Sequence, residues 1–187
     1  MLNSLPKKIL AALALLLIGF VVYVQTRPAE FRYERSGIIQ ASPEVIFPYL
    51  NQFKLGNEWS PYSKKDPNMQ FVFSGPEAGA GSKMEFKGNR DVGSGELEIL
   101  KSETNASVEL RLTMKEPIAG ENTVFYTLTP EGTGTRFTWA MSGKGGFISK
   151  LMTVLIDCEK MVAGDFEVGI QNLKTLIESK VGAPANG

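Results

Sequence analysis

The sequence predicts an α+β protein in which a curved antiparallel sheet of about seven strands surrounds a long C-terminal helix, preceded by one transmembrane helix. Three observations carry this prediction. Short segments between residues 69 and 142 alternate apolar and polar side chains, which is typical of half-buried strands. From Phe147 to about Ser179 the apolar residues recur every three or four positions, which indicates a helix. An uncharged apolar run, Ile9–Val24, also lies near the N-terminus.

Composition narrows the function classes. The 187 residues suffice for one domain and an appendage, and the hydrophobic fraction of 43% is ordinary for a globular protein. The formal net charge is zero and no run of Lys or Arg exceeds two residues, so we expect no nucleic-acid partner. With no histidine and one cysteine, Cys158, the chain has no intrachain disulfide, no zinc site is expected, and a histidine-based triad is excluded. No metal or cofactor is therefore expected.

The N-terminal segment has the length of a membrane anchor. Ile9–Val24 is uncharged, and a helix from Ile9 to Thr26 would be about 27 Å long, close to the bilayer core of about 30 Å. A cleaved signal peptide is the alternative, but no A-x-A pattern of small residues follows the apolar core. An uncleaved anchor over residues 1–26 is the favoured interpretation.

The flanking charges give the orientation of this anchor less clearly. Lys7 and Lys8 precede the span, which favours a cytoplasmic N-terminus and a domain on the non-cytoplasmic (periplasmic) side of the membrane. Arg27, Arg32 and Arg35 follow the span and weaken this asymmetry. The domain itself is expected over residues 27–182, with a disordered tail at 183–187.

The first elements of the domain are a strand and two short helices. Phe31–Gln40 has the composition of a strand. Ser42 is a good N-cap and Pro43 fits the first helical position, so a short helix begins here. A second short helix is expected over Gln52–Trp59, ending at the following Ser-Pro pair.

Six further strands are expected from the period of two. They are joined by turns rich in Gly, Pro and Asn, which favours an antiparallel meander. The expected segments are Gln70–Phe73, Ser82–Gly88, Glu96–Leu100, Val108–Met114, Thr123–Thr129 and Thr135–Ser142. The final helix, about 33 residues and roughly 50 Å long, is the only element large enough to cover the apolar face of this sheet.

A bent sheet around one helix leaves a gap, which predicts an apolar pocket. We expect the inward strand residues to face the helix, about half of them touching a ligand: Met84, Phe86, Leu97, Ile99, Leu110, Leu112, Phe125, Trp139 and Met141. Trp59 and Trp139 are the strongest candidates because each buried indole N–H needs a partner. Tyr62 is a further ligand-binding candidate. The alternative is that these residues only pack against the helix, with Trp59 closing one end of the barrel.

The start of the long helix is apolar nearly all round. Phe147–Ile156 carries a single charge, Lys150. Either loops bury this end, or it forms an exposed apolar lip that touches the bilayer and passes a lipid-like ligand to the pocket. In the second case Leu151 and Leu155 contact the ligand.

Several short motifs resemble one known superfamily, in the same order, over about three quarters of the chain. They are Ala41-Ser-Pro-Glu-Val-Ile-Phe47, Glu58-Trp-Ser-Pro-Tyr62, Asp66-Pro-Asn-Met69, Phe73-Ser-Gly-Pro76, Gly79-Ala-Gly81, Thr135–Ser142 and Met161–Lys174. On these residues the segment from Tyr33 to Glu178 resembles the START-related SRPBCC superfamily, in its polyketide cyclase/dehydrase-like branch. The resemblance implies a helix-grip fold with an internal cavity for a hydrophobic ligand.

Three functions are compatible with this pocket. The favoured one is a membrane-anchored binding or carrier domain for a hydrophobic small molecule or lipid. The second is an enzyme of the cyclase or dehydratase kind, in which Tyr62, Glu58 or Asp91 moves protons; the absence of histidine weighs against it. The third is an interaction domain whose pocket is too small to hold a ligand.

Overall fold

The computed structural model describes residues 5–155 and 158–181, so the predicted tail at 183–187 lies outside the described residues. Within this range the side chains of residues 5, 6, 152, 153, 155 and 158 are likewise not described. The chain divides into two units, one made of residues 1–31 and 144–158 and the other of residues 32–143 and 159–187.

The smaller unit holds the N-terminal helix α1 (Leu5–Gln25) and the short helix α5 (Phe147–Leu155). In the described part of the chain α1 is the one helix long and apolar enough to cross a membrane, and its side chains are exposed up to 71% at Leu16. The two helices are in contact, and Lys150 Nζ donates a hydrogen bond to the carbonyl of Gln25 at 2.9 Å. The Arg27 guanidinium lies over the Tyr23 ring, 4.4 Å from its centroid.

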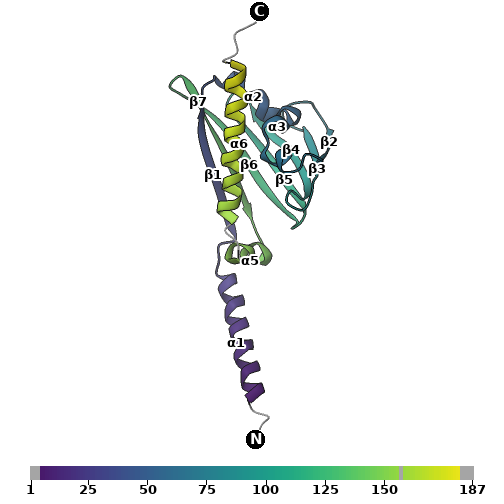
Figure 1. Cartoon of the computed structure of the whole chain (residues 1–187), viewed down its shortest axis with the longest axis vertical. Coiled ribbons are helices and arrows are strands. Elements are labelled where there is room, and N and C mark those ends of the chain that lie inside the picture. The colour runs from purple at the N-terminus through teal and green to yellow at the C-terminus, as the bar shows by residue number, and fades with distance from the viewer. Residues whose placement is uncertain (1–4, 156–157, 182–187) are drawn as a thin grey trace, which may run out of the picture. The chain divides into compact units, whose positions relative to one another are not determined.

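The larger unit is built on a seven-stranded sheet with the order β1-β7-β6-β5-β4-β3-β2 (Figure 1). Its strands are β1 (Glu30–Ile39), β2 (Gln70–Ser74), β3 (Lys83–Lys87), β4 (Ser94–Glu103), β5 (Ser107–Glu116), β6 (Gly120–Glu131) and β7 (Gly134–Lys144). From β2 to β7 each strand pairs antiparallel with the next in sequence. The fold class predicted from the sequence is confirmed, with the first strand at an edge of the sheet.

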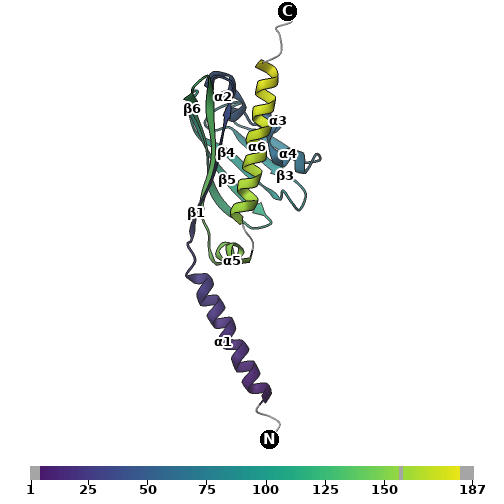
Figure 2. The same cartoon turned by 60° about the vertical axis from the view of Figure 1, so that its left-hand side comes forward.

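The sheet bends around its apolar face, as Figure 2 shows. The register between β4 and β5 shifts between Ile99 and Lys101, and an irregularity of this kind adds twist and bend to a strand. Gly95 sits at a second shift, where an added Cβ would lie 2.4 Å from the Thr113 carbonyl oxygen and 2.9 Å from the Phe86 ring. A glycine is required here because the neighbouring backbone approaches too closely for any side chain.

Three short helices follow the first strand: α2 (Pro43–Asn51), α3 (Phe53–Trp59) and α4 (Pro61–Lys65). The first begins after Ser42 with Pro43 at its start, as predicted. The third differs from the sequence-based expectation, in which the Ser60-Pro61 pair only ends the preceding helix. Proline fits the first helical position, where the missing N–H costs no hydrogen bond, and here it starts a new helix.

The last helix of the larger unit, α6 (Cys158–Val181), lies against the concave face of the sheet. One stripe of it is buried: Ala163, Phe166, Ile170, Leu173 and Ile177. Long polar side chains tie it on both flanks, because Lys174 Nζ donates to the Ile38 carbonyl in β1 and Asn172 Nδ2 donates to the Trp59 carbonyl in α3, at 2.8 and 3.1 Å.

The prediction of a single helix from Phe147 to about Ser179 is wrong. The structure describes two helices, α5 and α6, and they belong to different units. The apolar spacing continues through the boundary between them, so the periodicity alone gave no sign of the division.

Candidate ligand-binding site

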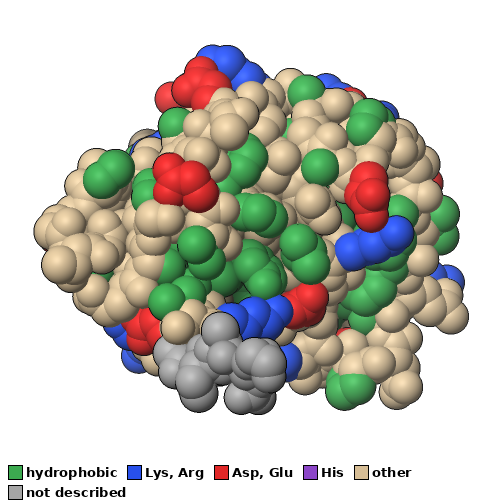
Figure 3. Space-filling model, turned by 90° about the horizontal axis from the view of Figure 1, so that it is seen from above, with side chains coloured by type: hydrophobic (Ala, Val, Ile, Leu, Met, Phe, Trp, Pro, Cys, Tyr) green, Lys and Arg blue, Asp and Glu red, His purple; other side chains and the backbone are tan. Residues whose placement is uncertain are grey.

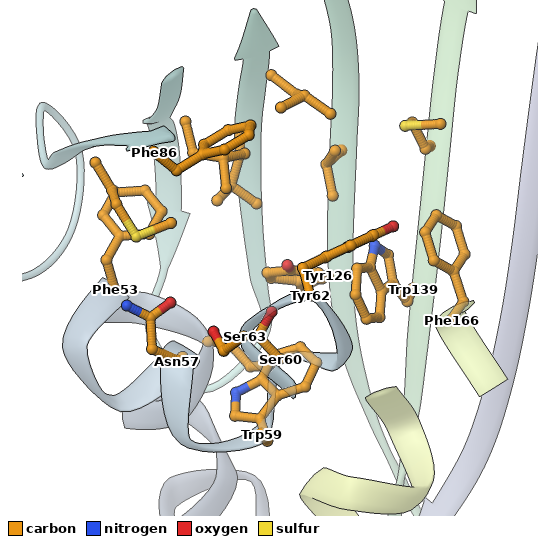
Figure 4. Close-up of a pocket in the computed structure, with 18 of the residues that line it drawn as sticks. Phe53, Asn57, Trp59, Ser60, Tyr62, Ser63, Phe86, Tyr126, Trp139 and Phe166 are labelled. Atoms are coloured by element: carbon orange, nitrogen blue, oxygen red, sulfur yellow. The ribbon is translucent and has the colours of Figure 1, made fainter. Parts of the chain in front are cut away.

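A cavity of about 270 Å³ lies within the larger unit, between the concave face of the sheet, the helices α2 to α4 and the first half of α6 (Figure 4). Its size is near the lower end of the range of about 300–1,000 Å³ for small-molecule sites. It is lined by Tyr49, Leu50, Gln52, Phe53, Gly56, Asn57, Trp59, Ser60, Tyr62, Ser63, Met69, Phe71, Met84, Phe86, Val92, Leu97, Leu110, Leu112, Met114, Asn122, Val124, Tyr126, Trp139, Met141, Val162 and Phe166.

Nine of the twelve ligand-binding candidates lie on this wall. They are Trp59, Tyr62, Met84, Phe86, Leu97, Leu110, Leu112, Trp139 and Met141. Ile99, expected on the same face, is fully buried but does not line the cavity. Whether any of these residues contacts a ligand remains a prediction.

Phe125 does not line the cavity, and its expected inward orientation is wrong. In the pairing of β6 with β7, Tyr126 is opposite Trp139 and Phe125 is opposite Ala140, so Phe125 falls on the other face of the sheet. The guanidinium of Arg32 lies 5.7 Å from the centroid of its ring. Tyr126 takes the place on the cavity wall that was expected for Phe125.

No described residue of the apolar lip lines this cavity. Leu151 belongs to α5 in the smaller unit and is not among the residues that line the cavity. The side chain of Leu155 lies outside the described residues. The start of α5 is exposed, with Phe147 at 37% and Ile148 at 53%.

Aromatic rings form one end of the cavity. The Trp139 ring stacks on Phe166 with centroids 4.4 Å apart, and it meets Tyr126 and Trp59 edge to face at 5.5 and 5.3 Å. Phe137 lies behind them, 5.9 Å from Trp59 and 5.7 Å from Tyr126, and is fully buried. Offset and edge-to-face pairs of this kind hold one another in fixed orientations.

The two tryptophans of the chain differ in what their N–H groups do. Trp59 Nε1 donates to the backbone carbonyl of Tyr49 at 2.9 Å, so its hydrogen-bonding capacity is used within the protein. Trp139 is 5% exposed, and its Nε1 has no hydrogen-bond partner among the described residues. The hydroxyl of Ser63 in α4 is also buried and unpartnered within the same part of the chain. Both residues line the cavity.

Two buried tyrosines also contribute hydroxyl groups to the wall. Burial raises the pKa of Tyr62 and of Tyr126 well above the usual range, and for Tyr62 the nearby Asp165 carboxylate and Tyr126 add to the rise. Both phenols therefore stay protonated at neutral pH. The described residues that line the cavity include no Asp, Glu, Lys or Arg, so the wall as described is apolar with a few neutral hydrogen-bonding groups.

Both charged candidates for proton transfer lie outside the cavity wall. Glu58 is exposed and pairs with Lys180 at 3.3 Å, and Asp91 is exposed in the turn between β3 and β4. Neither lines the cavity, whereas Tyr62 does. On the face seen in Figure 3, charges of both signs are scattered around a group of hydrophobic side chains, and neither sign forms a patch.

Asp66 is a buried acid that sequence reasoning missed. It is 8% exposed, and its two carboxylate oxygens accept the backbone N–H groups of Asn68 and Asn89 at 3.0 and 2.6 Å. It thereby ties the end of α4 to the turn that carries Val92 into the cavity wall. An acid followed by Pro and Asn is a common turn signal, but the partner at Asn89 is distant in sequence.

Gly169 sets how closely α6 approaches the aromatic end. An added Cβ there would lie 2.5 Å from Trp139 Cζ3 and 3.2 Å from Pro61 Cδ. Gly164, five residues earlier in the same helix, has no atom within 4 Å of such a Cβ. The first glycine is thus needed for close packing, and the second is not.

Fold and site together define a helix-grip domain with an internal apolar cavity. Residues 30–178 match the family described as polyketide cyclase / dehydrase and lipid transport, and the chain belongs to this family. The superfamily resemblance inferred from the sequence motifs is thereby confirmed. No curated protein sequence matches the chain.

Several solved structures share the fold. A protein of unknown function from Staphylococcus aureus is 12% identical with a TM-score of 0.63, and the match covers 82% of this chain and 97% of that one. The Aha1 dimer from Colwellia psychrerythraea is 18% identical with a TM-score of 0.57, covering 79% and 96%. A protein from Chromobacterium violaceum is 16% identical with a TM-score of 0.56, covering 81% and 99%. At these identities the likeness establishes the fold alone.

Proposed function

We propose that this protein is a binding or carrier domain that encloses a hydrophobic small molecule or a lipid-like chain in the cavity of its larger unit. The observation that supports this most directly is the wall itself, on which apolar and aromatic side chains predominate and the described residues carry no charge. Each methylene group moved from water into such a site contributes about 0.8 kcal/mol, so ten carbons supply most of a micromolar affinity.

The size of the cavity limits the occupant. At about 30 Å³ for each water-sized group, a volume of about 270 Å³ holds on the order of ten such groups. This favours a one- or two-ring molecule or a single short chain over a lipid with two long chains.

An enzyme of the cyclase or dehydratase kind is the alternative, and the family description includes it. Of the three proton-transfer candidates only Tyr62 lines the cavity. Because burial raises the pKa of Tyr62, this phenol is a poor base at neutral pH. The same cavity therefore supports binding better than proton transfer.

Filling the cavity tests the proposal. Leu112 and Leu97 face each other across β5 and β4 on the cavity wall. Leu112→Trp places an indole in the ligand's space, and we expect the fraction of protein carrying a co-purified apolar molecule to fall at least about ten-fold. Native mass spectrometry of the full chain, released from detergent micelles, measures this fraction.

The neighbouring residue provides a matched control. Thr113 is next in β5, points to the opposite face and does not line the cavity. Thr113→Trp should leave the occupied fraction unchanged. A folded Leu112→Trp protein with wild-type occupancy would show that the molecule binds elsewhere and would remove the proposal.

We infer further that residues 1–26 anchor a ligand-binding domain of residues 27–182, with the domain on the non-cytoplasmic side. The exposed apolar surface and length of α1 support the anchor. Tyr23 and Arg27 at its end are residues that favour the membrane interface. Because α5 contacts α1, an inserted α1 would bring α5 and its exposed Ile148 to the bilayer surface; the passage of ligand over this lip stays a prediction.

Membrane retention checks the anchor. We expect the protein to stay in the membrane pellet after alkaline carbonate extraction, with the intact mass of all 187 residues. Leu15→Arg combined with Leu16→Arg should release it, since each arginine at the centre of a span costs about 2.5–3.5 kcal/mol. A shortened mass would instead identify a cleaved signal sequence, and a reporter fused after Gly187 gives the side of the membrane.

A further inference from the structure

The unpartnered indole N–H of Trp139 is the most informative polar group on the cavity wall. It is held rigidly, since its ring stacks on Phe166 and meets Tyr126 edge to face. A buried N–H without an acceptor costs about 1–3 kcal/mol of stability, so it needs a compensating role. Trp59 offers a direct contrast, because its own N–H is satisfied by the Tyr49 carbonyl.

Other neutral donors gather beside this N–H. Tyr126 is the cross-strand partner of Trp139, and Figure 4 shows the indole nitrogen on the side of the ring that faces the tyrosines. Tyr62 and Ser63 lie in α4, and the first residue of this helix is Pro61. Pro61 lies close to Trp139, because a Cβ atom added at Gly169 would contact both of these residues. Burial raises the pKa of Tyr62 and of Tyr126, so both hydroxyls stay protonated and able to donate.

These groups define the complementary ligand. An indole N–H only donates, and a neutral phenol donates readily, so the missing partner is a hydrogen-bond acceptor. The described residues of the cavity wall include no cation to neutralise a carboxylate or phosphate. The two lysines that follow Ser63 are engaged elsewhere, because Lys64 Nζ donates a hydrogen bond to Asn172 Oδ1 at 2.8 Å and Lys65 is paired with Asp165 at 2.6 Å. An uncharged acceptor on an apolar body satisfies the donors without bringing a charge into the cavity.

We propose that the ligand of this cavity carries a carbonyl oxygen, which accepts hydrogen bonds from the indole N–H of Trp139 and the hydroxyl of Tyr126. The ligand class is thus a small, uncharged, apolar ketone, quinone or ester. This inference rests on the proposed function of the cavity and specifies its chemistry.

Benzophenone and diphenylmethane test the carbonyl directly. Both compounds have two phenyl rings, which are joined by a carbonyl group in benzophenone and by a methylene group in diphenylmethane. Both are close to the size that the cavity admits. The full chain is labelled with ¹⁵N-tryptophan in dodecyl maltoside, and it gives two indole signals because it has two tryptophans. Benzophenone should move the Trp139 signal downfield, while the Trp59 signal, already hydrogen-bonded, moves less. Diphenylmethane should not produce the downfield shift.

The hydroxyl of Tyr126 is tested by Tyr126→Phe, which keeps the ring and its contacts. We expect this change to weaken benzophenone about three- to ten-fold and to leave diphenylmethane unchanged. Each probe also partitions into the micelles. This partition is the same for wild type and variant, so it cancels in the ratio of their affinities. Trp139→Phe assigns the two signals; should that variant unfold, slow hydrogen exchange identifies the Trp59 signal.

The outcomes separate the two levels of the proposal. Binding of both probes with a benzophenone-specific shift at Trp139 and a benzophenone-specific loss in Tyr126→Phe supports the carbonyl site. Binding of both probes without either difference overturns the carbonyl inference and leaves the apolar carrier standing. If neither probe binds the folded protein, the carbonyl inference and the proposed function for ligands of this size both fail.

Discussion

Asp66→Ala is expected to destabilise the protein by about 3 kcal/mol. The substitution removes both acceptors of the Asn68 and Asn89 backbone N–H groups, and hydrogen bonds to a charged group contribute about 1.5–3 kcal/mol each. Because Asp66 joins α4 to the turn that carries Val92, ligand occupancy should fall with stability. Chemical denaturation of the full chain in detergent, followed by tryptophan fluorescence, measures the loss.

Asp91 provides the comparison within the same turn. It is also an aspartate, but it is exposed, so Asp91→Ala should change the free energy of unfolding by less than about 0.5 kcal/mol. Asp66→Asn keeps one carbonyl acceptor and should fall between the wild type and Asp66→Ala. Equal stabilities of Asp66→Ala and Asp91→Ala would mean that the two hydrogen bonds of Asp66 do not hold this end of the cavity together.

The second large effect is expected at two glycines of α6, whose replacement by alanine should change the free energy of unfolding in opposite directions. Gly169→Ala places a methyl group 2.5 Å from Trp139 Cζ3, and overpacking of this kind costs about 1–3 kcal/mol. The Trp139 ring cannot yield freely, because Phe166 stacks on it at 4.4 Å. Gly164→Ala meets no neighbouring atom and should gain about 1 kcal/mol from helix propensity.

The pair of variants is measured together by thermal unfolding. For a domain of this size, about 1 kcal/mol corresponds to a shift of roughly 2–4 °C in Tm, so the two variants should move in opposite directions from the wild type. Gly169→Ala should also weaken ligand binding, because it displaces Trp139 on the cavity wall. A Gly169→Ala protein as stable as Gly164→Ala would show that α6 does not approach the sheet this closely.

The fold was predictable because local signals agreed with tertiary structure. Ser42 and Pro43 start a helix where expected, and all six later strands fall on segments that were expected to be strands. The pocket followed from geometry, and most strand residues with one clear apolar face line it. Strand ends were the weakest point: β4 continues to Glu103, beyond the expected Leu100.

What could not be predicted depended on pairing between distant segments. In Thr123–Thr129 both alternating sets contain apolar residues, so the segment alone does not tell whether Phe125 or Tyr126 points inward. The register with β7 decides it, by placing Tyr126 opposite Trp139. In the same way, the buried carboxylate of Asp66 has a partner at Asn89, and no local pattern indicates that contact.

The absence of charge from the described cavity wall has a consequence for where the protein can work. Acidification empties many binding proteins by protonating a histidine or carboxylate that holds the ligand, but the groups described around this cavity do not titrate between mildly acidic and mildly alkaline solution. The raised pKa values of Tyr62 and Tyr126 extend that range upward. A ligand enclosed in this cavity should therefore stay bound over a wide range of acidity, and its release would depend on movement of the chain or on a competing apolar phase.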